Sequence, residues 1–159
     1  MSSSHTRHIG SFTPSTNRDR VSSILLQPPD PHALLVLGHG AGTHLDHPFM
    51  HGMADALGVE GVATFRYNYP YSEAGRGGMD SERVRLDTVC AAIAAATSAA
   101  PHLTTFAGGH SMSGRMTTLA AARRRIEHLH GLVAFAFPLH LSLIHISEPT
   151  RRTPISYAV

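Results

Sequence analysis

The sequence has 159 residues, of which 42% are hydrophobic and 15% are charged. This balance is typical of a globular chain that can bury the core of one domain. The formal net charge is only +2, and the basic residues are all arginines, scattered apart from the run 123–125. That pattern argues against a nucleic-acid-binding surface. A single cysteine, Cys90, excludes an internal disulfide framework.

The first 20 residues are rich in Ser, Thr and Arg and have no apolar periodicity. We predict that 1–20 is a disordered tail. The segment also lacks the apolar core of a signal peptide, and no apolar run of the sequence reaches membrane-spanning length. We therefore expect a cytoplasmic protein with no membrane contact, whose folded domain occupies residues 21–140.

From residue 21 onward, short apolar runs alternate with segments of helical periodicity. Strands are expected at 21–26, 33–37 and 62–67, from 103 into the glycine pair 108–109, and at 131–137. Helices are expected after Asp46, which can cap a helix with Pro48 in its first turn, from 80–82 to Pro101, and at 112–125. The second helix has an apolar stripe at helical spacing, made by Leu86, Val89, Cys90, Ile93 and Ala96. This alternation predicts an α/β fold with a mostly parallel sheet and flanking helices.

The stretch 103–116 has the strand, glycine turn and helix of a nucleophile elbow, with Ser111 as the candidate nucleophile. The sharp turn requires small residues two positions before and after the nucleophile, and these positions hold Gly109 and Ser113, with Gly114 next. Ser113 cannot be the nucleophile by the same rule, because Arg115 would then occupy a position that needs a small residue. The alternative is an ordinary glycine-rich turn between a strand and a helix.

A second glycine-rich stretch, 38–42, follows the strand 33–37. A dinucleotide-binding fingerprint does not fit, because its third glycine would fall at Thr43. We predict instead that the loop offers a backbone N–H to the oxyanion of an acyl-transfer intermediate. Ala41 would supply one donor and Met112, the residue after the nucleophile, the other. The supporting residues of this loop are His39, Gly40 and Gly42; the alternative is a plain tight turn.

Three histidines, His44, His47 and His51, are spaced so that two could share one helical face. No cluster of carboxylates or cysteines completes a metal site, so we expect neither a metal nor an organic cofactor. His110 lies beside the candidate nucleophile in sequence. We do not expect it to be the catalytic base, because an elbow directs neighbouring side chains away from the nucleophile.

From about residue 33 to 140 the sequence resembles the α/β-hydrolase superfamily. More narrowly, it is similar to the dienelactone-hydrolase-like branch that includes NSL-complex subunit three and testis-expressed protein thirty. Five segments carry the resemblance in the same order: 38–42, 46–50, 66–71, 108–116 and 137–140. Relatives usually have Lys or Arg at position 110 and Gly at position 113.

The resemblance implies a serine hydrolase that acts on a carboxylic ester or another small acyl substrate. It also implies an acid after a later strand and a histidine near the C-terminus, and we find neither in the sequence. The alternative function is a catalytically silent domain of the same fold that binds a protein partner.

Residues 141–159 resemble something other than protein. The segment 141–151 resembles a direct translation of a transposase sequencing-library adapter, and 155–159 resembles the flow-cell primer that follows it. The gap 152–154 fits the frame of a short sample index. We therefore predict that native sequence stops at His140 and that the chain as written is an inactive fragment. The alternative is a natural sixth strand at 141–146, with His145 and Glu148 as candidate functional residues.

Overall fold

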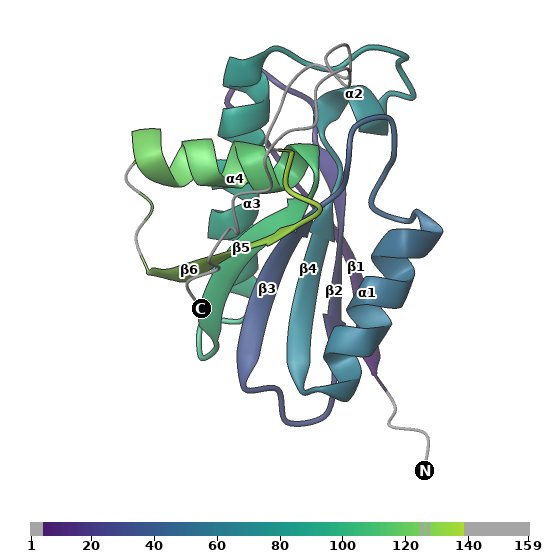
Figure 1. Cartoon of the computed structure of the whole chain (residues 1–159), viewed down its shortest axis with the longest axis vertical. Helices are drawn as coiled ribbons and strands as arrows, with labels where there is room; N and C mark the ends of the chain where they lie inside the picture. Colours follow the sequence, from purple (N-terminus) through teal and green to yellow (C-terminus); the bar gives the residue numbers. More distant parts are fainter. Residues whose placement is uncertain (1–4, 125, 127, 139–159) are drawn as a thin grey trace, which may run out of the picture.

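The structure, a computed structural model, describes residues 5–124, 126 and 128–138. Six strands form one sheet in the order β1-β2-β4-β3-β5-β6 (Figure 1). Their bounds are β1 (Thr6–Phe12), β2 (Val21–Gln27), β3 (Ala33–Gly38), β4 (Val62–Tyr67), β5 (Thr104–His110) and β6 (Leu129–Phe135). β2 pairs antiparallel with β1 and β4, whereas the pairs β3–β4, β3–β5 and β5–β6 are parallel. The predicted mostly parallel α/β sheet is therefore confirmed.

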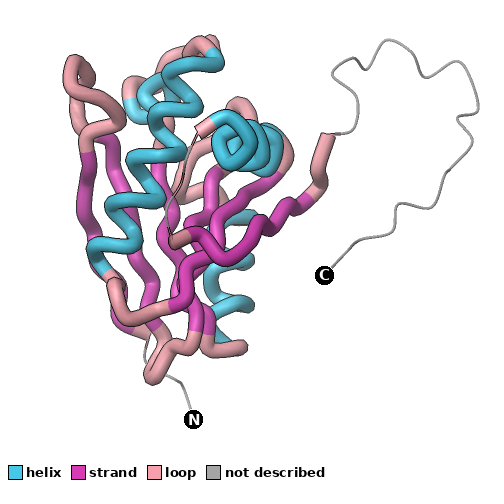
Figure 2. The backbone as a smooth tube through the Cα atoms, turned by 90° about the vertical axis from the view of Figure 1, so that its left-hand side faces the viewer, coloured by secondary structure: helices cyan, strands magenta, loops and turns pink. Residues whose placement is uncertain are grey.

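Helices cover both faces of the sheet (Figures 1 and 2). Their bounds are α1 (Pro48–Val59), α2 (Pro70–Glu73), α3 (Glu82–Ala99) and α4 (Met112–Arg123). Alternate residues of β3 point to opposite faces, so Leu34 and Val36 join the core with α3 and α4, whereas Leu35 and Leu37 pack with α1. Because β3 is buried on both faces, it reads as a continuous apolar run.

The buried face of the long helix α3 is formed by the predicted apolar stripe. Leu86, Val89, Ile93 and Ala96 are buried, and Cys90 is half-buried. At the helix start, the Ser81 hydroxyl accepts a hydrogen bond from the backbone N–H of Val84 at 3.4 Å.

The prediction of a disordered tail over residues 1–20 is wrong, because residues 6–12 form the strand β1. β1 pairs with β2 along its whole length, from Thr6 opposite Gln27 to Phe12 opposite Val21. The other residues of β1 are exposed, while Phe12 is buried against Phe65, with the ring centroids 6.2 Å apart. Since backbone pairing and one aromatic anchor hold this strand, it has no apolar periodicity that a sequence pattern could reveal.

The start of α1 also differs from the prediction. The N-cap is His47, whose Nδ1 accepts from the N–H of Phe49 at 3.2 Å, and not Asp46. The Asp46 carboxylate instead pairs with Arg7 and contacts Nε2 of His51. An imidazole thus takes the place of the expected carboxylate cap.

Smaller differences lie at the ends of elements. The short helix α2 lies in the segment 68–78, where no helix was predicted. β6 spans 129–135 where 131–137 was predicted, and α4 ends at 123 where 125 was expected. The side chain of Leu132 is 46% exposed, so this edge strand shows apolar surface.

Residues 139–159, and with them the predicted boundary at 140, lie outside the described residues. β6 lies at one edge of the described sheet (Figure 1). Within the described ranges, no helix combines the length and apolar character needed to cross a membrane.

Candidate active site

The chain turns sharply at Ser111, between the end of β5 and the start of α4. Its backbone has φ 49° and ψ −106°, a conformation that residues other than glycine rarely adopt. The Ser111 N–H donates a 2.8 Å hydrogen bond to the carbonyl of Phe135 in β6, which holds the turn. A side chain kept in strained backbone geometry at the end of a parallel strand is typical of a functional site.

The small residues around this turn are required by close backbone contacts. A Cβ at Gly109 would lie 2.5 Å from the Gly38 carbonyl oxygen and 2.5 Å from the Ser113 Cβ. A Cβ at Gly114 would lie 3.0 Å from the carbonyl oxygen of Gly109 and 3.2 Å from the Cβ of Ala134. The first turn of α4 therefore lies almost directly against β3, β5 and β6.

No acidic side chain lies in the first turn of α4. Ser111 is the N-cap of this helix but makes no side-chain capping hydrogen bond. The first backbone N–H groups of a helix have no partner within the helix and favour negative charge. The N–H of Met112 is the first of these, next to the Ser111 side chain.

The loop after β3 holds one of its peptide groups firmly. The Gly40 carbonyl accepts from His39 Nδ1 at 2.8 Å and from Thr43 Oγ1 at 2.9 Å. His39 is fully buried, so this carbonyl faces inward. In a trans peptide the N–H points opposite to the C=O, and the described residues contain no cis peptide. The N–H of Ala41 therefore faces outward, and Gly42, with φ 71°, completes the turn.

His39 supports this loop as a neutral imidazole. Its ring lies edge-on to Tyr69, with the centroids 5.1 Å apart, and its Nε2 has no hydrogen-bond partner. Burial lowers the pKa of His39 from 6.5 to about 4; the hydrogen bond to the Gly40 carbonyl opposes this shift, and the charge of His44 adds to it. The Nδ1–H that donates to Gly40 is therefore present, and the ring is uncharged, at neutral pH.

This lowered pKa predicts a loss of stability in acid. The unfolded chain, with a His39 pKa near 6.5, binds a proton more readily than the fold, where the pKa is about 4. The contribution is complete above pH 6.5 and is lost as the pH falls toward 4, by about 3 kcal/mol. Urea denaturation at several pH values measures it. His39→Gln should flatten the slope, whereas His8→Gln, at an exposed position, should not. Parallel slopes for wild type and His39→Gln would contradict the assignment.

His110 does not contact the Ser111 hydroxyl through a hydrogen bond. A Cβ at Gly40 would lie 2.7 Å from His110 Nδ1, and the His110 ring centroid is 4.5 Å from that of Phe49. The ring thus packs between the loop after β3 and the start of α1. In the described part of the chain, no histidine is hydrogen-bonded to Ser111.

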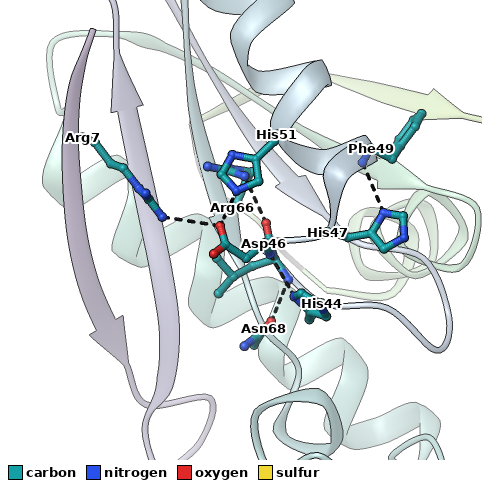
Figure 3. Close-up of polar contacts among 9 residues, drawn as sticks. Arg7, His44, Asp46, His47, Phe49, His51, Arg66 and Asn68 are labelled. Carbon is teal, nitrogen blue, oxygen red and sulfur yellow. Dashed lines mark hydrogen bonds and ion pairs between the residues drawn. The ribbon is translucent and has the colours of Figure 1, made fainter.

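The three histidines considered as metal ligands order the loop before α1 instead (Figure 3). His51 Nε2 lies 2.6 Å from Asp46 Oδ1, and Arg7 reaches the same oxygen at 3.4 Å. His44 Nδ1 accepts from the Asp46 N–H at 3.2 Å, while His47 caps α1. Among residues 5–124, 126 and 128–138, no group of three His, Cys, Asp or Glu residues is placed to hold a metal ion.

A cavity of about 700 Å³ lies beside the loop after β3. Its walls are the segment 42–46, part of the segment 68–79, and residues of β1 and β2. Ser111 is not among its lining residues, so the cavity adjoins the proposed oxyanion loop without including the elbow. Two of its lining residues, Ser22 and Asn68, donate through their side chains to Glu73, which anchors α2 to β2.

Comparison with known proteins agrees with the observed fold. Residues 31–153 match the sequence profile of a family described as "Alpha/beta hydrolase domain". A search of curated proteins returned no match. The family match extends past residue 140 into the segment that resembles translated adapter.

Solved structures share the fold at low identity. They include a dienelactone hydrolase from Anabaena variabilis, with 20% identity and a TM-score of 0.69, covering 82% of this chain and 62% of that one. A carboxyl esterase from Bacillus coagulans has 20% identity and a TM-score of 0.68, covering 81% and 44%. A serine hydrolase without a lid from Xanthomonas campestris has 18% identity and a TM-score of 0.67, covering 83% and 62%. The chain thus spans less than two thirds of the length of each.

Proposed function

Because this chain belongs to the alpha/beta hydrolase domain family, we propose that its parent protein is a serine hydrolase acting on a carboxylic ester or a related small acyl substrate. The observation that carries the proposal is the strained backbone of Ser111, φ 49° and ψ −106°, between β5 and α4. A plain turn between a strand and a helix has no need of this conformation, whereas a nucleophile elbow requires it.

In the proposed reaction, Ser111 Oγ attacks the acyl carbon while its proton passes to a histidine. The tetrahedral oxyanion accepts hydrogen bonds from the N–H groups of Ala41 and Met112. The histidine then protonates the leaving alcohol, which departs and leaves an acyl-serine ester. Water, deprotonated by the same histidine, releases the acid and restores Ser111. No metal or organic cofactor takes part.

This proposal needs a histidine and an orienting acid from outside the described residues. Without such a base, a serine hydroxyl is a weak nucleophile at neutral pH. We propose that both lie in native sequence that replaces 141–159 in the parent protein. Adapter-free long reads of the source DNA past the codon for His140 test this. A frame that continues through further strands to an Asp and a late His supports it. Genomic DNA that encodes 141–159 refutes it and makes His145 and Glu148 candidates again.

The function is tested by covalent labelling of the full-length protein with a fluorophosphonate. We expect one adduct, located at Ser111 by peptide mass mapping, and turnover of short-chain p-nitrophenyl esters. Ser111→Ala should remove the label, whereas Ser98→Ala, at an exposed position on α3, should retain it. A folded full-length protein that neither labels nor hydrolyses esters would instead fit a catalytically silent domain that binds a protein partner.

A further inference from the structure

Ser113 fills a tight space between two strands. It is fully buried in the first turn of α4. Cβ atoms built on Gly38 and Gly109 would lie 2.6 Å and 2.5 Å from the Ser113 Cβ, so the side chain occupies the gap between the ends of β3 and β5. The elbow pattern asks only for a small residue at this position. A buried hydroxyl goes beyond that requirement, and it is costly unless it is hydrogen-bonded.

The Ser113 hydroxyl is the middle member of a buried chain of hydrogen bonds. It donates to the carbonyl of His39 at 2.5 Å, and it accepts from the Tyr69 hydroxyl at 2.8 Å. The chain begins at the Tyr67 hydroxyl, which lies 3.4 Å from the Tyr69 hydroxyl. A carbonyl can only accept, so the donors run in one direction, from Tyr67 to Tyr69 to Ser113. Burial raises the pKa of Tyr69 to about 12, which keeps its phenol a donor at neutral pH.

This chain ends on the loop that carries the outward-facing N–H of Ala41. Ser113 holds the carbonyl of His39, and the next carbonyl, that of Gly40, is held by His39 Nδ1 and Thr43 Oγ1. Side chains thus fix two consecutive peptide groups, and the second contains the Ala41 N–H. The three elements joined in this way are the loop after β3, the segment after β4 and the first turn of α4.

We propose that Ser113 is a positioning residue of the oxyanion hole, which, held by Tyr69, keeps the loop 39–43 in register with the start of α4. The inference rests on the proposed hydrolase function, because the spacing of the Ala41 and Met112 N–H groups matters only if both bind one oxyanion. Donors fixed in place before the reaction stabilise the developing charge best. A shift of the loop by about 1 Å would weaken that stabilisation without removing either donor.

The test compares wild type, Ser113→Ala, Tyr69→Phe, the double variant and Thr88→Val in the full-length protein. Thr88 is buried on α3, where its hydroxyl donates to the carbonyl of Val84, and it serves as the matched control for the loss of a buried hydroxyl. In Ser113→Ala, amide exchange in 39–43 should rise by about tenfold, the effect of losing one buried hydrogen bond. The kcat for ester hydrolysis should fall by about tenfold, with KM within about twofold. Because Tyr69 acts through Ser113, the double variant should be no worse than Ser113→Ala alone.

The two readouts separate this inference from the function on which it rests. Unchanged amide exchange in 39–43 of Ser113→Ala overturns the inference, even if the wild type is an active esterase. Additive effects of Ser113→Ala and Tyr69→Phe overturn it as well. Faster exchange in the loop of a protein that hydrolyses no ester would support the structural link while refuting the hydrolase function.

Discussion

Ser111→Ala is expected to lower the kcat of the full-length protein for ester hydrolysis by roughly 10⁴-fold or more. The substitution removes the only atom that we assign to attack on the acyl carbon. It leaves the Ser111 N–H free to bond to the Phe135 carbonyl, so the fold should be retained. Steady-state kinetics with a p-nitrophenyl ester and a thermal melt of the same sample measure both effects. Residual activity near that of wild type would assign the nucleophile elsewhere.

Ser111→Gly is the informative companion variant, because it also lacks the nucleophile but removes the backbone strain. Ser111 has φ 49° and ψ −106°, and such conformations cost of order 1–3 kcal/mol in a non-glycine residue. Glycine loses about 0.5–1 kcal/mol in chain entropy on folding. We therefore expect Ser111→Gly to exceed Ser111→Ala in free energy of unfolding by about 1 kcal/mol. Equal stabilities would show that the turn is not strained.

Gly109→Ala is expected to destabilise the fold by about 3 kcal/mol or more. The new Cβ would lie 2.5 Å from the carbonyl oxygen of Gly38, which is backbone and cannot move aside without shifting β3. It would also lie 2.5 Å from the Ser113 Cβ, so the start of α4 would have to move away. Denaturation in urea gives the free energy of unfolding.

Gly52→Ala is the matched control for this prediction. Gly52 lies within α1, is exposed, and offers open space around a new Cβ. There the change should raise the free energy of unfolding by about 0.5–1 kcal/mol, since alanine is the better helix former. If Gly109→Ala were as stable as Gly52→Ala, the close approach of β3, β5 and α4 would be incorrect.

Most of the fold could be predicted, because burial on a sheet or helix face leaves a pattern in the sequence. The apolar runs predicted β2 to β6, and the helical spacing of Leu86, Val89 and Ile93 predicted α3. β1 and α2 lacked such a signal. β1 is held by pairing with β2, and α2 is anchored by hydrogen bonds from β2 to Glu73, far away in sequence.

The local part of the candidate site could also be predicted, since an elbow is defined by small residues within a few positions of Ser111. The chain from Tyr69 through Ser113 could not, because it joins residues on different elements that only the folded sheet brings together. Arg66 is a similar case. It occupies a strand predicted as apolar, yet it is buried and donates to the carbonyl of Leu45 in a distant loop.

The place of β3 at the middle of the sheet restricts the order in which the chain can assemble. Both of its neighbours, β4 and β5, come later in the sequence, and Ala33 at the start of β3 pairs with Thr104 at the start of β5. On a ribosome, β1 and β2 can form a hairpin as soon as they emerge, whereas β3 gains its first neighbour only when β4 has been made and its second only after β5. Contacts so distant in sequence raise the contact order, which slows folding. β3, whose six residues are all buried in the fold, is therefore paired on both edges only after β5 has been made.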